Sequence, residues 1–129
     1  MRLWHDRLIP FLPRQQLLGQ HRECCALRGN GWGRKHATVD YVFRHSPAFL
    51  VAYHFLVMAE MDARGYKHAK EWDEPSYRGA KCLPWEELIM EFAMRYPEHD
   101  KTYLKECLEN LRKKGIEIEL SEEKSAADL

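Results

Sequence analysis

The sequence has few cysteines and no long apolar run. No apolar stretch approaches the roughly 20 residues of a membrane-spanning helix, and the charged residues near its start do not fit a secretory signal. The four cysteines include an adjacent pair and form neither a disulfide framework nor a paired CxxC metal motif. These absences predict a reduced, cytoplasmic protein with no membrane partner and no bound metal.

Proline and glycine are also scarce, at 6 and 7 of the 129 residues, which excludes fibrous and low-complexity classes. A chain of this length buries roughly two thirds of its unfolded surface, enough for a core without disulfides. We expect a monomer with a single helical domain over residues 1–120, followed by an acidic, frayed tail over residues 121–129.

The chain has no net charge, but its positive and negative residues are unevenly distributed along the sequence. The formal net charge is zero, yet residues 1–45 carry eight Lys or Arg against three Asp or Glu, whereas residues 85–129 carry seven against twelve. A basic first third that also holds four of the seven histidines indicates an anionic partner. The alternative is a dipolar protein whose charges are simply solvated.

The apolar spacing and the Pro and Gly positions predict an all-α fold of four or five helices. Ser46-Pro47 is a strong start signal, and Gly29, Gly65 and Gly115 are stop signals. Residues 66–83 are expected to form a long ordered loop, and residues 116–120 alternate like a short strand that has nothing to pair with. The longer helices are expected at residues 14–28, 47–64, 84–96 and 100–114, with a short helix or turn at 38–44.

The first candidate for chemistry is the α-amine of Met1. Methionine removal generally requires a small second residue, and the second residue here is Arg2, so we expect Met1 to be retained with a free amine. An α-amine has a pKa of about 7.7–8.0, against about 10.4 for lysine, so a large fraction is neutral near pH 7.5. Such an amine can form an imine without a buried lysine. Most N-termini, however, have no chemical role.

The second candidate is Glu23, beside Arg22 in the expected helix 14–28. Gly19 lies one turn earlier on the same helix face. Glycine within a helix costs about 1 kcal/mol relative to alanine, and close approach of a ligand would explain it, leaving Glu23 in a depression of small residues. The alternative is tight helix packing at Gly19, with Glu23 on the surface or paired with Arg22.

The third candidate is the glycine-rich loop that ends in Arg34, Lys35 and His36. Trp32 offers a stacking face and the three cationic or titratable residues can meet phosphates, which is typical of a nucleic-acid contact loop. A tryptophan tucked into the core would give the same sequence. Two other groups are weaker candidates for a functional site. His54 is expected to be a core histidine. The adjacent Cys24 and Cys25 point about 100° apart on a helix, which is too far for both to bind one metal ion.

Taken in order, these residues resemble the pyrimidine-dimer DNA glycosylase family. The resemblance covers roughly residues 1–84, and Arg-Glu at this distance from an N-terminal amine is its most distinctive part. It rests on Met1-Arg2, Gln15, Leu17, Arg22-Glu23, Arg34-Lys35-His36, Ser46-Pro47, Arg64-Gly65-Tyr66 and Arg78-Gly79.

The resemblance implies a compact helical fold in which the N-terminal segment runs between helices and brings the amine beside the glutamate. It implies a glycosylase that acts on damaged double-stranded DNA and then nicks the strand by β-elimination, without a cofactor. Met1 would be the nucleophile and Glu23 the acid–base group. The implied DNA contacts are Arg2, Arg22, Arg28, Trp32, Arg34, Lys35, His36 and Arg78, with Trp32 or Trp4 filling the gap left by an extruded nucleotide.

Two departures bear on the substrate. Methionine stands where the best-known member of the family exposes a small residue, and an acidic stretch after Gly115 replaces the aromatic, basic C-terminal segment. Action on abasic sites or on another modified base is therefore a version of the same hypothesis. The alternatives from other classes are a nucleic-acid-binding module that has lost the chemistry and a small helical interaction protein.

Overall fold

The computed structural model describes residues 2–36 and 38–120. The proposed nucleophile Met1 and the acidic tail 121–129 lie outside the described residues, as does residue 37. The described residues form three α-helices and three 3₁₀ helices and contain no strand, so the all-α prediction is confirmed. In chain order the elements are η1 (Asp6–Phe11), α1 (Arg14–Arg28), η2 (Asp40–Arg44), α2 (Pro47–Ala63), η3 (Lys70–Asp73) and α3 (Lys101–Lys113).

Local signals in the sequence define the ends of the long helices. The Ser46 hydroxyl accepts a hydrogen bond from the Ala48 amide and caps α2, and the Asp100 carboxylate accepts one from Tyr103 and caps α3. Gly65 and Gly115 follow the C-terminal ends of α2 and α3 with φ of 80°, the left-handed conformation that glycine adopts without strain.

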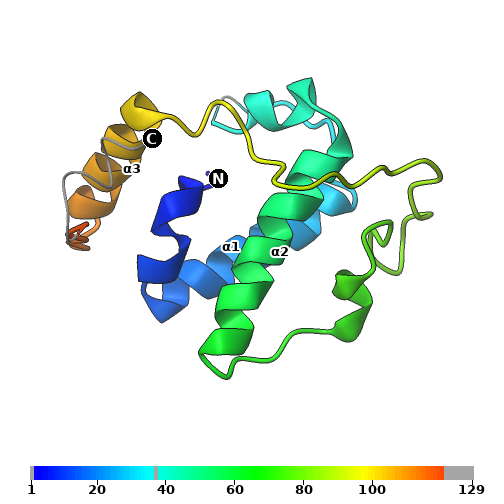
Figure 1. The fold of residues 1–129 in the computed structure, drawn as a ribbon, viewed down its shortest axis with the longest axis horizontal. Coiled ribbons are helices and arrows are strands. Elements are labelled where there is room, and N and C mark those ends of the chain that lie inside the picture. The colour runs from blue at the N-terminus through cyan, green and yellow to red at the C-terminus, as the bar shows by residue number, and fades with distance from the viewer. Residues whose placement is uncertain (1, 37, 121–129) are drawn as a thin grey trace.

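Helices α1 and α2 pack against each other at the centre of the molecule (Figure 1). The N-terminal segment and η1 lie between this pair and α3, as the hydrogen bonds described below require (Figure 1). Residues from all of these elements share one apolar core, which includes Leu3, Leu17 and Leu111. The expectation that the N-terminal segment runs between helices is therefore met. None of the helices described is long and apolar enough to cross a membrane.

The prediction of a helix at 84–96 is wrong. This segment is irregular and crosses the N-terminal half of α2 on its way to α3 (Figure 1). Two of its large apolar side chains are left uncovered, since Ile89 is 72% and Phe92 101% exposed. A helix of this length needs such side chains to be packed if it is to be stable in water. The expected loop 66–83 exists but contains the short helix η3.

Two buried histidines contribute to stability only while they are neutral. Burial lowers the pKa of His54 to about 2 and that of His99 to about 3. In the unfolded chain both would titrate near pH 6.5. The unfolded state therefore binds protons more readily than the folded state. The contribution of these histidines to the free energy of unfolding is complete above pH 6.5 and is lost as the pH falls toward 3.

We predict that the free energy of unfolding falls between pH 6.5 and 4 by up to about 1.4 kcal/mol per pH unit for each buried neutral histidine. Urea unfolding at pH 7.5, 6.0 and 5.0 measures this. His99→Asn should weaken the dependence, whereas His36→Gln, at an exposed position, should retain it. Equal unfolding free energies at pH 7.5 and 5.0 would contradict the prediction.

Candidate active site

The backbone of residues 2–6 is held by side chains from three helices. Gln20 of α1 donates from Nε2 to the Arg2 carbonyl at 2.7 Å and accepts at Oε1 from the Trp4 amide at 3.1 Å. Tyr53 of α2 donates from its hydroxyl to the Trp4 carbonyl at 2.6 Å. These side chains supply hydrogen-bond partners to backbone groups that lie in the core and belong to no helix.

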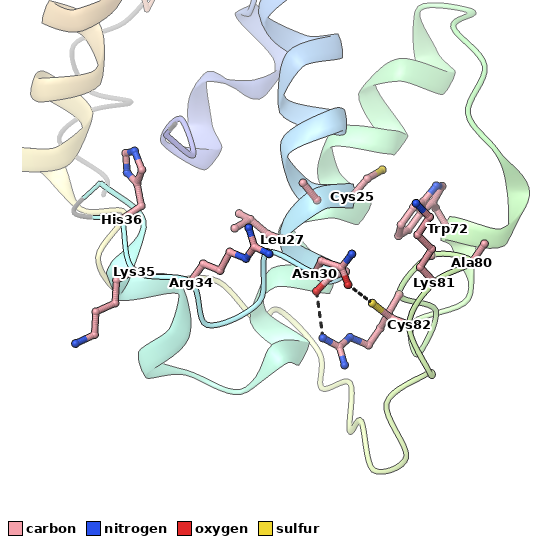
Figure 2. A pocket seen from close by; sticks show the side chains of 15 residues that line it. Cys25, Leu27, Asn30, Arg34, Lys35, His36, Trp72, Ala80, Lys81 and Cys82 are labelled. Atoms are coloured by element: carbon pink, nitrogen blue, oxygen red, sulfur yellow. Dashed lines mark hydrogen bonds between the residues drawn. The ribbon is translucent and has the colours of Figure 1, made fainter.

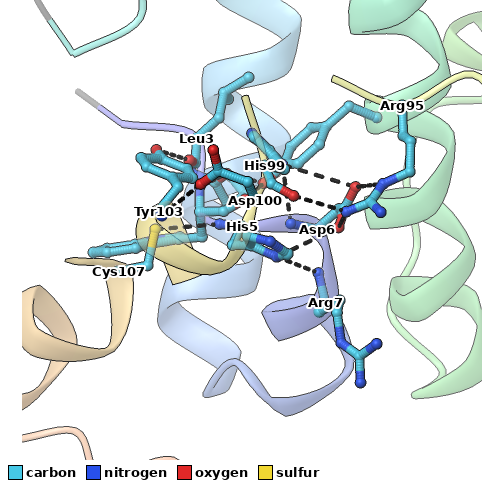
Figure 3. A network of polar contacts seen from close by, with 12 residues as sticks. Leu3, His5, Asp6, Arg7, Arg95, His99, Asp100, Tyr103 and Cys107 are labelled. Carbon is cyan, nitrogen blue, oxygen red and sulfur yellow. Dashed lines mark hydrogen bonds and ion pairs between the residues drawn. The ribbon is translucent and has the colours of Figure 1, made fainter. Parts of the chain in front are cut away.

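Helix α3 and the segment before it hold the other side of the N-terminal segment (Figure 3). Tyr103 donates to the Leu3 carbonyl, and the His5 amide donates to the Cys107 sulfur at 3.4 Å. The Asp6 amide donates to Nδ1 of His99 at 3.1 Å.

The Asp6 carboxylate is paired with Arg95 at 2.8 and 2.9 Å, so an ion pair joins the N-terminal segment to the irregular segment as well. The Arg95 side chain of this ion pair is 46% exposed to solvent. The position of the first residues thus depends on every long helix of the fold and on the connection into α3.

Beside this segment lies a cavity of about 490 Å³ that contains Glu23. Arg2 and Trp4 line it from the N-terminal segment, and Gly19 lines it from α1. Apart from the nearby backbone of its own helix, a Cβ added at Gly19 would meet nothing closer than the guanidinium of Arg22, also on α1, at 3.8 Å. Gly19 therefore faces a hollow rather than a packed helix, which is the depression that the sequence suggested.

Glu23 is half-buried in this cavity. Its Oε1 atom is fully buried and has no hydrogen-bond partner among the described residues. Burial raises the pKa of the carboxyl, while the positive charges of the amino terminus and of His36 act in the opposite direction. A buried carboxylate oxygen without a partner is costly to keep and is available to a substrate or a proton. The arrangement suits acid–base chemistry or stabilisation of a developing cation.

A second cavity, of about 730 Å³, lies at the C-terminal end of α1 and is lined by cationic side chains (Figure 2). Arg34 points into it and Lys35 points away from it, and both are exposed (Figure 2). His36, also exposed, and Lys81 line the same cavity. This surface brings together the three basic or titratable residues that the sequence predicted as phosphate contacts and adds Lys81.

Other predicted DNA contacts lie in different surroundings. Arg22 is exposed on α1, and Arg2 is half-buried over the rings of Trp4 and Tyr103. Trp32 packs edge-to-face against Phe43, with ring centroids 4.9 Å apart, which matches the alternative of a tucked-in tryptophan.

Arg78 donates to the Arg28 and Gly29 carbonyls, so it caps the end of α1 and lines the cationic cavity at the same time. Its guanidinium also lies over the Trp85 ring, 4.7 Å from the centroid.

Arg28 requires a correction. Its side chain is fully buried, and its guanidinium donates to the backbone carbonyls of four residues in the 66–83 loop (Trp72, Glu74, Pro75 and Tyr77). A guanidinium enclosed in this way cannot reach a phosphate, so Arg28 is left out of the DNA contacts. It anchors the loop instead, as a single buried cation bound to oriented carbonyl dipoles.

A cluster of His21, Cys25 and His54 has ligand atoms that all lie within 4.8 Å of one another, close enough for a metal ion. Arg28 lies 3.0 Å from Nδ1 of His54, and because a guanidinium can only donate, Nδ1 must accept. The proton of neutral His54 is then on Nε2, which lies 2.9 Å from Nδ1 of His21. A metal ion would have to displace that proton, so the cluster suits a directional chain of hydrogen bonds better than a metal site.

The Glu23 cavity is also lined by Gln20 and Asn110, which the sequence did not single out, and by Lys114. The sequence predicts Lys114 to be part of a solvated helix end, with phosphate contact as the alternative. Gln20 lies one turn before Glu23, a spacing that places both on one helix face. Asn110 and Lys114 come from the end of α3, and local sequence carries no signal for that tertiary contact.

Comparison with known proteins identifies a family. A family model described as pyrimidine dimer DNA glycosylase matches residues 1–74, more than half of the chain. No curated protein and no solved structure matches the chain significantly.

We predict that Arg28→Met lowers the free energy of unfolding by at least about 2 kcal/mol, because several buried carbonyls lose their donors. Urea unfolding measures the loss. The exposed Arg22→Met variant is the matched control and should change stability by less than about 0.5 kcal/mol. An Arg28→Met protein as stable as the wild type would show that the guanidinium does not anchor the loop.

Proposed function

The chain belongs to the pyrimidine dimer DNA glycosylase family, and we propose that it removes a damaged base from double-stranded DNA and then cleaves the strand by β-elimination. The observation that carries this proposal is Glu23, whose partly buried carboxylate shares one cavity with Arg2 in a chain of this family. The substrate class follows from the family. The route through an imine rests on the expected α-amine of Met1.

In the proposed reaction the neutral α-amine attacks C1′ of the damaged nucleotide. The C1′–base bond breaks with its electron pair, and the departing base takes a proton. The amine nitrogen then loses its remaining proton as the sugar ring opens at C1′–O4′, which leaves an imine. Loss of a C2′ proton and of the 3′-phosphate completes β-elimination, and water releases the sugar fragment.

Glu23 has two tasks in this scheme. Its negative charge stabilises the cationic sugar as the base leaves, and the carboxylate then accepts and returns protons at O4′ and C2′. The raised pKa of the carboxyl favours the second task, because a proton acceptor is most effective when its pKa approaches the working pH.

The cations around the site would hold the phosphates. Arg34, Lys35 and His36 offer an exposed surface beside the cationic cavity, and Lys114 offers a further charge at the Glu23 cavity. Phosphate contacts of this kind position the duplex without reading its sequence.

We predict that Glu23→Gln lowers strand nicking by at least about 100-fold, because the variant can neither accept protons nor stabilise the sugar cation. Binding should stay within about threefold, since the substitution removes no phosphate contact. The measurement uses duplexes that carry one thymine dimer or one abasic site, with borohydride to trap the imine. The exposed Glu109→Gln variant is the control and should retain full nicking.

A wild-type protein that forms no adduct with either damaged duplex would overturn the imine mechanism. Salt-dependent binding without any product would then favour the non-catalytic nucleic-acid-binding module.

The phosphate contacts give a separate prediction. Arg34→Gln and Lys114→Gln should each lower the slope of log binding constant against log salt by about 0.9, because each releases one counterion fewer. Affinity measured between 50 and 200 mM KCl, on damaged and undamaged duplexes alike, tests this. The control is Lys67→Gln, an exposed lysine that lines neither cavity. An unchanged slope for either variant would remove that residue from the DNA-binding surface.

A further inference from the structure

Gln20 makes an unusual pair of contacts for a buried side chain. It is 4% exposed, and its amide spans the N-terminal segment from the Arg2 carbonyl to the Trp4 amide. One hydrogen bond would leave the segment free to pivot about the contact. Two bonds to the peptide groups on either side of Leu3 fix both its position and its rotation.

The orientation of this amide is determined by its partners. The Arg2 carbonyl can only accept and the Trp4 amide can only donate, so Nε2 must face Arg2 and Oε1 must face Trp4. The Tyr53 hydroxyl lies 2.6 Å from Oε1 and also 2.6 Å from the Trp4 carbonyl, and its single proton can be donated to only one of these two acceptors at a time. Tyr53 is itself buried, at 3% exposure, so bulk water does not compete for these contacts.

Gln20 and Glu23 are carried by one rigid element. They are three residues apart on α1, so their positions along the helix axis differ by about 4.5 Å and they lie on neighbouring parts of one face. Both line the 490 Å³ cavity. No loop intervenes between the residue that holds the chain's first residues and the carboxylate.

We propose that Gln20 is a positioning residue that sets the place of the chain's first residues relative to Glu23 and thereby controls the rate of imine formation. The proposal rests on the function proposed above. Gln20 does not touch the reacting atoms; it acts through the backbone at Arg2 and Trp4. In support, the charge of the amino terminus is among the influences that lower the pKa of Glu23.

Of the side chains that resemble it, glutamine alone can make both hydrogen bonds to the N-terminal segment from this position. Glutamate would lose the donor to the Arg2 carbonyl, asparagine is shorter by one methylene group, and leucine keeps the approximate volume while offering neither polar atom. Gln20→Leu is therefore the variant that removes the two-point contact with the least change in packing.

The first test needs no DNA. The pKa of the α-amine is measured from the pH dependence of its acylation, followed by mass spectrometry of the N-terminal peptide. Glu23→Gln should lower this pKa by about 0.5 or more, because a neighbouring anion is removed. In the Gln20→Leu background the same change should shift the pKa by less than about half as much. An equal shift in both backgrounds, or none in the native background, would overturn the proposal.

The second test separates positioning from stability. Gln20→Leu should slow borohydride trapping on an abasic duplex by at least about tenfold, since small misplacements of reacting groups are costly. Binding to a duplex with a tetrahydrofuran abasic analogue should stay within about threefold. Arg64→Gln is the matched control, because Arg64 also holds backbone carbonyls of the N-terminal region, at Pro10 and Leu12, but outside the cavity.

Arg64→Gln should lower the melting temperature yet keep trapping within about twofold of the wild type. Equal losses of rate in Arg64→Gln and Gln20→Leu would show that Gln20 acts only through stability. If Gln20→Leu does not fold, Tyr53→Phe, which removes the hydroxyl beside Oε1, should give the same changes at smaller size. A wild-type protein that forms no adduct ends the imine proposal, and the amine titration still decides the role of Gln20.

Discussion

The fold depends on one constraint: the backbone of residues 2–5 passes through the core, ahead of η1, without belonging to a helix or a sheet. Its amides and carbonyls therefore need partners from elsewhere, and they find them in side chains of α1, α2, α3 and the segment before α3. The three helices must pack correctly before this segment has its full set of hydrogen bonds. The first residues of the chain, which are usually the least ordered part of a protein, are in this way tied to the whole tertiary structure.

Helix α1 carries two buried polar side chains that each organise a non-helical segment. Gln20, in the middle of the helix, holds the N-terminal segment, and Arg28, at its last residue, holds the loop between α2 and the irregular segment. Glu23 lies between these two residues, and its buried Oε1 atom has no hydrogen-bond partner within residues 2–36 and 38–120. Gln20 and Arg28 therefore fix the backbone segments on both sides of the Glu23 carboxylate. A preorganised site requires such support, because the carboxylate then does not have to move when the substrate binds.

The parts of the fold that the sequence predicted are those with local signals. Helices 14–28, 47–64 and 100–114 have proline, serine or aspartate at the start and glycine at the end, and the structure has them within a residue or so. The helix expected at 84–96 rested on a proline at each end, and such signals do not report that Ile89 and Phe92 stay exposed. The family resemblance implies Arg28 as a DNA contact, and the sequence does not correct this, because an arginine that binds carbonyls and one that binds phosphates look the same in a sequence. Gln20 was missed because Arg2, Trp4 and Tyr53 meet it only in three dimensions.

The family match covers the part of the chain that carries Glu23 but not the acidic C-terminal third, which raises the question of how that third lies beside a DNA substrate. The match ends at residue 74, so Glu23, Gln20 and Tyr53 lie within it, whereas α3 lies outside it. Helix α3 belongs to the acidic third of the sequence, but its last turn is basic, as the helix dipole favours. Lys114, which directly follows α3, lines the Glu23 cavity. Although α3 belongs to the acidic third, its end therefore presents a cationic residue to the Glu23 cavity. Because Asn110 and Lys114 form that wall of the cavity, substitutions at the end of α3 could alter which lesion fits without disturbing the carboxylate or the residue that positions the chain's start.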